Sequence, residues 1–251
     1  VMFDIDTSFD FTTDTPNYWT NYWETDSLLG HAGNDPDLKS RTLCMYSQRL
    51  WSRELPNGQI MSLQIKQNDN SLYWGDFRFG SDSIIVSFRY KRYREMIEKV
   101  SRLLPDYHSY IEHYIRKSCT IGGKIIFPKI AGGINQSRGC NPYIKDRWDL
   151  TLECIRLYYQ NQPSPLYEVL GKNKAFFDLF VDFKGYVDFF LLQDCVNSDY
   201  SKVNFWMDFK EFTKIPLPKS PDEYMLWIEN ELTFVEQRNK RINDYLRMIN
   251  T

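Results

Sequence analysis

The chain has 251 residues, of which 42% are hydrophobic and 25% are charged, a balance that is typical of globular proteins and excludes a disordered or fibrous chain. Its 31 lysine and arginine residues and 33 aspartate and glutamate residues give a formal net charge of −2. This balance excludes a global attraction to nucleic acid or anionic lipid, so any such binding must be local.

Cysteine usage and hydrophobicity indicate the compartment. The five cysteines are odd in number and never spaced as Cys-x-x-Cys, which favours a reducing environment over a disulfide framework or a zinc ribbon. The first residues lack the basic and apolar regions of a secretory signal, and the most apolar stretch, residues 175–196, is interrupted by five charged side chains. We therefore expect a cytoplasmic protein without a membrane partner.

Residues 1–48 form an acidic arm that is rich in aromatic side chains. No lysine or arginine precedes Lys39. The aromatic residues that are expected to attach the arm to the body of the protein are Tyr18, Trp19, Tyr22 and Trp23. The composition predicts an irregular segment that wraps around the rest of the chain.

Residues 49–130 are predicted to form mainly strands, together with two helices. Turn-forming residues at 55–58, 68–70 and 80–83 separate predicted strands at 61–66, 72–74 and 84–88, which is the pattern of an antiparallel meander. Apolar residues recur at helical spacing over 93–104, and a shorter helix is expected over 106–117. A further strand is expected over 121–128, where a proline ends it.

Residues 131–251 are predicted to be mainly helical. The last helix begins with a capping box, in which Ser220 precedes Pro221 and Glu223, and its apolar face extends from Tyr224 to Ile249. Because strands come first and helices later, the sequence predicts one α+β domain over residues 1–251. In that domain an N-terminal antiparallel sheet packs against a helical C-terminal half.

An aromatic stretch over residues 176–190 is a second feature of this half. At helical spacing, one face holds Phe176, Phe180, Phe183, Val187 and Phe190. Core packing explains this face more simply than a cofactor site does.

The glycine-rich segment 131–142 is the first candidate site. It connects the strand that ends at residue 128 to a helix that we expect to begin near Lys145. A polar loop beside a helix N-terminus can hold an anion, and the candidate anion contacts are Asn135, Gln136, Ser137 and Arg138. The segment matches neither a dinucleotide-binding motif nor a P-loop, so a long surface connection is the simpler alternative.

The helix that follows carries the second candidate site. Its polar side chains fall three and four residues apart and so form one stripe: Asp146, Asp149, Glu153, Arg156 and Gln160. The rest of the helix is apolar and must be buried, so the stripe needs either internal partners or a water-filled cleft. In the cleft interpretation Asp149 and Glu153 act as acid, base or metal ligands, and Arg147 and Arg156 join the anion contacts. Internal ion pairs are the alternative.

A basic run interleaved with aromatic residues is the third candidate. Nucleic-acid-binding surfaces often combine basic and aromatic side chains in this way, and the basic residues here are Arg89, Lys91, Arg92 and Arg94. The run also opens a predicted helix. The acidic residues that follow at i,i+4 spacing favour an ordinary solvated helix face instead.

Several short motifs along the chain are specific enough to indicate a family. They are Leu50-Trp51-Ser52 with Leu55-Pro56-Asn57-Gly58, Gly80-Ser81-Asp82-Ser83-Ile84, Ile121-Gly122-Gly123 with Ile126-Phe127-Pro128, Ile134-Asn135-Gln136 with Arg138-Gly139, Asp146-Arg147 with Asp149-Leu150-Thr151-Leu152-Glu153-Cys154-Ile155-Arg156, and Asp182-Phe183-Lys184-Gly185-Tyr186. With these motifs the chain resembles an uncharacterised bacterial family of unknown function over most of its length. The resemblance implies a bacterial cytoplasmic setting and one continuous unit. One position departs from the family's sequence pattern: Leu157 follows Arg156 where the resemblance leads us to expect a second arginine.

Two classes of function follow from the sequence. The first is a binding protein or enzyme that acts on a phosphate-bearing ligand, a nucleotide or a nucleic acid, at the glycine-rich segment and the acidic stripe. A divalent metal is compatible with those carboxylates, although no specific metal motif is present. The second is a non-catalytic module that binds another protein through its acidic arm and aromatic surface.

Overall fold

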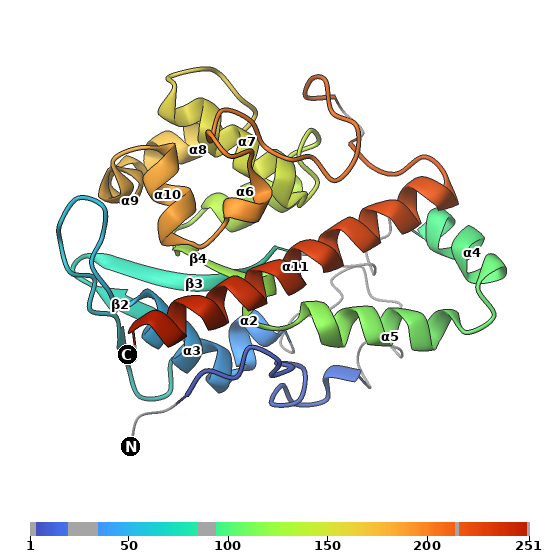
Figure 1. Ribbon diagram of the computed structural model, residues 1–251, viewed down its shortest axis with the longest axis horizontal. Coiled ribbons are helices and arrows are strands. Elements are labelled where there is room, and N and C mark those ends of the chain that lie inside the picture. Colours follow the sequence, from blue (N-terminus) through green and yellow to red (C-terminus); the bar gives the residue numbers. More distant parts are fainter. Residues whose placement is uncertain (1–3, 20–34, 85–93, 214–215, 250–251) are drawn as a thin grey trace.

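Four strands form one antiparallel sheet in the order β1-β2-β3-β4 (Figure 1). They are β1 (Gln64–Ile65), β2 (Leu72–Trp74), β3 (Phe77–Ser83) and β4 (Lys124–Pro128). The computed structural model describes residues 4–19, 35–84, 94–213 and 216–249, with the side chains of residues 94–98 left out. The expected antiparallel sheet in the N-terminal half, followed by a helical C-terminal half, is confirmed.

Strand β3 differs from the prediction in its length. It continues through Gly80, Ser81, Asp82 and Ser83, where a turn was predicted, because these residues pair with β4 from Phe127 back to Lys124. A ladder of backbone hydrogen bonds here outweighs the turn preference of the side chains. Of the strand predicted over 84–88, residues 85–88 lie outside the described residues.

The predicted strand 61–66 is shorter than expected, because only Gln64 and Ile65 are paired with β2. The alternation is nevertheless confirmed, since Met61 and Leu63 are buried while Ser62 between them is exposed. The segment therefore contributes to the core before it joins the sheet.

Ten helices are described along the chain. They are α2 (Pro36–Lys39), α3 (Arg41–Trp51), α4 (Arg94–Leu103), α5 (Tyr107–Ser118), α6 (Ile134–Cys140), α7 (Trp148–Tyr159), α8 (Tyr167–Lys172), α9 (Lys174–Phe177), α10 (Phe183–Phe189) and α11 (Pro221–Ile249), with 3-10 turns η2 (Ile121–Gly123), η3 (Asp178–Phe180) and η4 (Gln193–Cys195). Helices α4 and α5 and the helical C-terminal half agree with the prediction. In Figure 1, α6 to α10 gather on one side of the sheet, and α11 runs alongside α5.

The end of the acidic arm was predicted wrongly as irregular. Its last part forms α2 and most of α3, and each helix has a polar N-cap: the Asp35 carboxylate accepts a hydrogen bond from the Asp37 amide, and the Ser40 hydroxyl accepts one from Leu43. Tyr18 is buried as expected. Trp19 is partly buried against the core, whereas residues 22 and 23, the remaining predicted anchors, lie outside the described residues.

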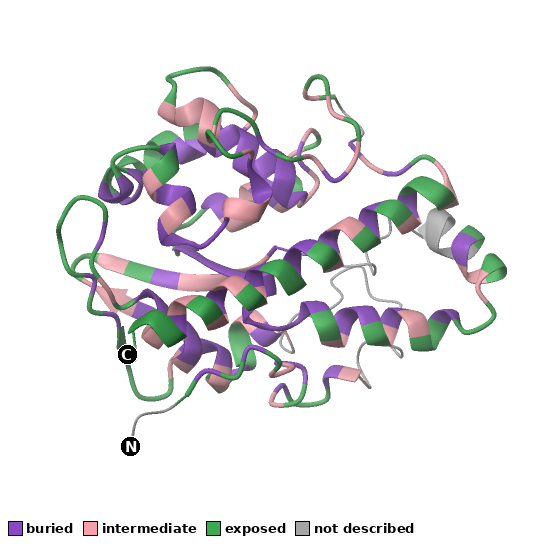
Figure 2. Cartoon of the chain, in the orientation of Figure 1, coloured by how far each residue is buried: buried purple, intermediate pink, exposed green. Residues whose placement is uncertain are grey.

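Helix α11 begins as its capping signal predicts. The Ser220 hydroxyl accepts a hydrogen bond from the Glu223 amide at 3.2 Å, whereas the Glu223 carboxylate accepts its own bond from the Lys219 amide at 2.7 Å. The helix buries one face along most of its length (Figure 2). Ile249 was predicted to belong to that face but is exposed, so the buried face ends at Leu246.

Side-chain hydrogen bonds to backbone attach α11 to the start of β4. Arg238 Nη1 donates to the carbonyl oxygens of Gly122 and Lys124 at 2.9 and 2.6 Å, and Asn239 Oδ1 accepts from the Gly122 amide at 2.7 Å. A Cβ atom at Gly122 would lie 2.5 Å from the Val235 carbonyl oxygen. The close approach of helix and turn therefore requires glycine at this position.

The aromatic stretch packs as predicted, although it is broken into α9, η3 and α10. The five residues of its predicted core face are all buried: Phe176, Phe180, Phe183, Val187 and Phe190. Two residues that flank α10, Val181 and Leu191, have positive φ angles of 69° and 53°. Such angles are costly for a side chain with a Cβ atom, most of all for β-branched valine.

Candidate functional site

Asp149 lies in a sealed ion pair at the start of α7. Arg147 Nε donates to Asp149 Oδ1 at 3.0 Å, and a second short hydrogen bond joins Arg147 Nη2 to Asp149 Oδ2. The Trp206 amide donates to the same carboxylate at 3.1 Å, and both charged side chains are only 1% exposed. The open cleft that we expected at Asp149 is not present, because Arg147 neutralises the carboxylate inside the protein.

Glu153, one turn further along α7, is paired in a similar way. Arg156 donates to both of its carboxylate oxygens, at 2.8 and 2.7 Å, and also to Gln160 at 3.1 Å. Hydrogen bonding to Glu153 raises the pKa of Arg156. The polar stripe therefore forms internal ion pairs, the alternative left open by the sequence, and a catalytic role for its carboxylates stays a prediction.

The glycine-rich segment is a helix rather than a long loop, since α6 occupies most of it. Arg138 is fully buried there: its Nε donates to the Thr151 hydroxyl at 2.9 Å, its Nη2 donates to the Asp146 carbonyl at 3.1 Å, and it forms an ion pair with Asp82 of β3. The burial of Ile134 and Arg138 and this pairing attach α6 to the rest of the protein. Arg138 is thus committed to the protein's own groups.

The other predicted anion contacts do not converge with Arg138. Asn135 donates from its side chain to the Ser81 carbonyl at 3.4 Å, and the Ser137 hydroxyl donates to Gly132 at 3.4 Å. Gln136 is exposed on the opposite side of the helix from the buried Arg138 and Ile134. Anion binding by these side chains stays a prediction.

The predicted nucleic-acid contacts lie outside what the structure describes. Arg89, Lys91 and Arg92 are not described, and α4 begins at Arg94, whose side chain is also left out. Their role stays a prediction.

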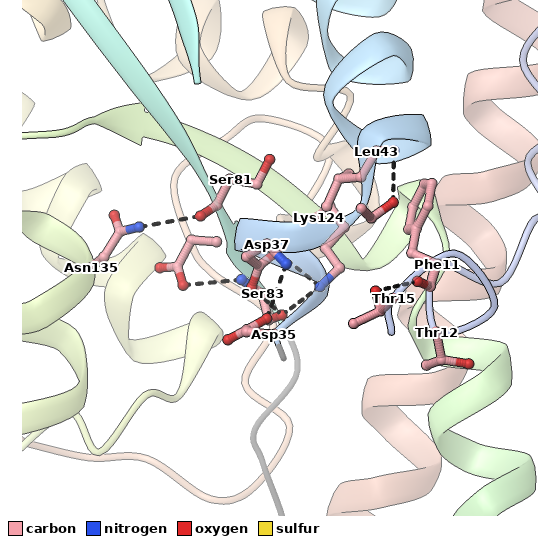
Figure 3. A network of polar contacts seen from close by, with 12 residues as sticks. Phe11, Thr12, Thr15, Asp35, Asp37, Leu43, Ser81, Ser83, Lys124 and Asn135 are labelled. Carbon is pink, nitrogen blue, oxygen red and sulfur yellow. Dashed lines mark hydrogen bonds and ion pairs between the residues drawn. The ribbon is translucent and has the colours of Figure 1, made fainter. Parts of the chain in front are cut away.

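A polar network that the sequence did not reveal joins α2, β3 and β4 (Figure 3). Lys124 Nζ donates to Asp37 Oδ1 at 2.9 Å and to Ser83 Oγ at 2.7 Å, and Ser83 Oγ donates to Asp37 Oδ2 at 2.9 Å. Asp35 caps α2 beside them, and the adjacent Asp82 pairs with Arg138. The network therefore links the end of the acidic arm to the sheet.

Electrostatics argue against nucleophile chemistry in this network. Burial alone would lower the pKa of Lys124, but Asp37 and Asp35 outweigh burial and raise it. A lysine that keeps its proton cannot accept one from Ser83, so the short Ser83–Lys124 contact is not an activated pair. Burial and repulsion from Asp37 raise the pKa of Asp35 to about 7, and burial raises that of Asp82 to about 6 although Arg138 opposes it.

Arg53 lies in a different environment, between two aromatic rings. Its guanidinium carbon is 4.6 Å from the ring centroid of Phe189 and 4.3 Å from that of Tyr245, and its Nη2 donates to the Phe189 carbonyl oxygen. It forms no ion pair with a described carboxylate, and its buried Nε finds no acceptor. Burial lowers the pKa of Arg53, partly offset by hydrogen bonding to Tyr245.

This arginine lines an open pocket with a volume of about 510 Å³. The wall is built from three parts of the chain: residues 53–56 after α3, Asp188, Phe189 and Leu191 around the end of α10, and Tyr245 of α11. A volume in this range suits a small molecule. The pocket thus combines a cation that pairs with no described carboxylate, apolar side chains and access to solvent.

Comparison with known proteins gives one match, to a protein family. The model of a family of unknown function, DUF6994, matches residues 5–242. The chain belongs to this family. No curated protein and no solved structure matches it. The resemblance carried by the short motifs is thereby confirmed at the level of the family, and DUF6994 membership assigns no activity, cofactor or partner.

Two further findings concern the described part of this DUF6994 chain. No described helix is both long enough and apolar enough to cross a membrane. Among the described residues, no three His, Cys, Asp or Glu side chains are grouped so that they could hold a metal ion.

Sequence reasoning missed Arg53 because its partners are remote in the chain. The residues that enclose it come from α10 and α11, and the carbonyl that it contacts belongs to a residue 136 positions away. The local signal was limited to an arginine near the turn at 55–58, in the gap between the two parts of the first family motif. That signal gives no indication of whether the guanidinium finds a carboxylate.

Proposed function

We propose that this DUF6994 protein binds a small ligand through an anionic group, which Arg53 holds in the pocket formed by residues 53–56, Asp188, Phe189, Leu191 and Tyr245. The observation that carries the proposal is the half-buried guanidinium of Arg53, which faces a pocket of about 510 Å³ without an ion-pair partner among the described residues. A buried charge is usually paired, so an unpaired one beside a cavity favours an external counter-charge.

The proposal keeps an anionic ligand, as expected from the sequence, but does not require a phosphate group, and it moves the binding site. The arginines of the glycine-rich segment and of α7 are already used: Arg138 by Asp82, Arg147 by Asp149, and Arg156 by Glu153. A phosphate-bearing ligand at those positions would have to displace an internal carboxylate. An anion at Arg53 displaces none.

A bacterial cytoplasm is the setting that we propose for this binding, as the sequence motifs and the cysteine usage suggest. The alternative function, a module that binds another protein through its acidic arm, rests on residues 1–48, of which 20–34 lie outside the described residues. No contact of the described residues favours it over ligand binding.

Titration calorimetry on the full chain tests the proposal with inorganic phosphate, adenosine monophosphate, propionate and L-leucine as probes. At least one probe should bind, and Arg53→Gln should weaken that binding at least tenfold, because a charge-assisted hydrogen bond contributes about 1.5–3 kcal/mol. Thermal shifts provide a second readout, since a ligand at a hundred times its Kd stabilises the native state by about 2.7 kcal/mol.

Arg41→Gln is the matched control. Arg41 is exposed in a second pocket of about 640 Å³ beside Lys39 and residues 67–70, where it donates to the Asp69 carbonyl and the Asn70 side chain. Its removal should leave binding unchanged. Absence of binding by every probe, or loss of binding in Arg41→Gln alone, would contradict the proposal.

A further inference from the structure

The charges around the Arg53 pocket restrict the chemistry of its ligand beyond a simple anion. Besides Arg53, two charged side chains line the pocket, and both are acidic: Glu54 and Asp188. The formal charges of the lining residues therefore sum to −1, although Arg53 has no ion-pair partner among the described residues. A multiply charged anion is poorly matched to such a wall, because like charges near the site oppose its binding.

Asp188 stays ionised in this position. Burial alone would raise its pKa, but hydrogen bonds from Lys184, Tyr200 and Gln193 outweigh burial and lower it. The Tyr200 hydroxyl and the Gln193 amide donate to Oδ1 at 2.7 and 2.9 Å, and Lys184 pairs with Oδ2. These bonds fix the carboxylate at the wall of the pocket.

Glu54 differs from Asp188 in having no ion-pair partner among the described residues. It is exposed and lies in a short antiparallel bridge with Ile60, which fixes its backbone next to that of Arg53. Adjacent residues thus present an unpaired cation and an unpaired anion at the same pocket. A ligand that carries both charges would satisfy the two groups together.

The remainder of the wall is apolar. Leu55, Pro56, Phe189 and Leu191 contribute hydrocarbon surface, and the Tyr245 ring covers Arg53 from the other side. Burial of apolar ligand surface against these residues is favourable. The ligand therefore needs an apolar portion in addition to its charged groups.

We propose that the ligand is a zwitterion with an apolar side chain, such as a free α-amino acid, whose carboxylate meets Arg53 and whose ammonium group meets Glu54. This inference rests on the proposed function, since it specifies the ligand of the same pocket. It differs from the ligand predicted from the sequence, because a phosphate monoester carries up to two negative charges and no cation.

Titration calorimetry on the full chain with three matched probes tests the inference. L-Leucine has both charged groups, 4-methylpentanoate lacks the ammonium group, and 3-methylbutylamine lacks the carboxylate. L-Leucine should bind at least tenfold more tightly than either analogue, and inorganic phosphate and adenosine monophosphate should bind more weakly than L-leucine.

Glu54→Gln separates the role of the ammonium group from that of the carboxylate. This variant should weaken L-leucine binding about three- to tenfold and should leave 4-methylpentanoate binding equal or stronger, because a repelling charge has been removed. Arg53→Gln should weaken both. Glu168→Gln, an exposed glutamate on α8, is the matched control and should change neither.

The outcomes distinguish this inference from the proposed function. If 4-methylpentanoate, phosphate or the nucleotide binds as tightly as L-leucine and Arg53→Gln weakens that binding, the zwitterion is wrong and anion binding at Arg53 stands. If no probe binds, or Arg53→Gln changes nothing while its circular dichroism spectrum and Tm show a folded protein, both proposals are wrong. Arg53→Lys, which keeps the charge, provides a second test if Arg53→Gln fails to fold.

Discussion

The network around Lys124 and the pocket around Arg53 differ in how a partly or fully buried cation is neutralised. Lys124 and Arg138 lie among three carboxylates, those of Asp35, Asp37 and Asp82, so negative charge is in excess and two of the acids have raised pKa values. Arg53 lies among rings and a carbonyl oxygen, and it forms no ion pair with a described carboxylate.

The difference shows which buried charges are available to a ligand. A guanidinium that already holds a carboxylate, such as Arg138 or Arg147, offers little to an incoming anion, because binding would first break an internal pair and strand its partner. Arg53 requires no such exchange. A buried charge alone therefore does not indicate a ligand-binding site. A buried charge that lacks an internal ion-pair partner and lies beside a cavity is the stronger indication.

The largest expected effect comes from breaking the Arg147–Asp149 pair. Asp149→Ala leaves the Arg147 guanidinium buried without a counter-charge and removes the acceptor of the Trp206 amide. We expect a loss of about 3–5 kcal/mol in the free energy of unfolding, measured by urea titration, and a decrease in Tm of at least about 6 °C.

Two further variants serve as comparisons for the loss of stability in Asp149→Ala. Asp178→Ala removes an exposed carboxylate whose pair with Lys174 has exposed fractions of 58% and 68%, and should cost at most about 1 kcal/mol. The double variant Arg147→Met with Asp149→Leu should recover most of the loss, since a well-packed apolar pair can replace a buried ion pair. A cost below about 1 kcal/mol for Asp149→Ala would show that water reaches the pair.

A smaller effect should appear in the pH dependence of stability. Asp35 has its pKa raised from 3.8 to about 7, so the folded state holds this proton more tightly than the unfolded state does. Between about pH 4 and pH 7 the folded state then binds more protons, and its contribution to stability decreases as the pH rises through that window. Asp37, Asp82 and Lys124 are the charged groups that face Asp35.

Asp35→Asn isolates this contribution, because asparagine still caps a helix but carries no charge. The variant should be more stable than the parent at pH 8 by up to about 4 kcal/mol and should lose the advantage at pH 4. Asp76→Asn, at an exposed turn, is the control and should leave the pH profile unchanged. Equal stabilities of Asp35→Asn and the parent at pH 8 would contradict a raised pKa.

Local patterns were sufficient to predict much of the fold. Helical periodicity identified α4 and α5, and the Ser220 capping box identified the start of α11, because those signals depend on neighbours in sequence. Strand β3 and helix α6 were missed for the opposite reason. Their Gly80–Ser83 and Gly132–Gly133 regions resemble turns locally, and what stabilises them is the pairing with β4 and the burial of Arg138.

The candidate site was less predictable. The sequence correctly required that the α7 carboxylates be paired or hydrated, but helical spacing could not identify Arg147 as the partner of Asp149, since residues two apart do not face each other on a helix. Arg147 is the extended N-cap residue of α7, with φ −64° and ψ 121°, which lets it reach Asp149. The pairing depends on backbone geometry that residue spacing does not reveal.

The smallest expected effect concerns the turn that leads into α10. Val181 has φ 69° and ψ −54°, and the Asp182 amide donates to the Phe180 carbonyl at 2.8 Å, which closes a three-residue γ-turn. This conformation is strained for a β-branched residue. The side chain is 63% exposed, so its packing contributes little to offset the strain. Helix α10 carries Asp188 and Phe189 of the Arg53 pocket, so the strain lies directly before a pocket wall.

Val181→Gly should therefore stabilise the protein by about 0.5–1 kcal/mol in urea unfolding, because relief of about 1–3 kcal/mol of strain exceeds the entropic cost of glycine. Val181→Ala, which keeps a Cβ atom, should change stability by less than about 0.5 kcal/mol and is the matched control. The affinity of both Val181 variants for L-leucine should also be measured by calorimetry and compared with that of Arg53→Gln. If the turn holds the pocket wall in place, Val181→Gly gains stability but loses affinity, whereas unchanged affinity would mean that the turn only connects η3 to α10.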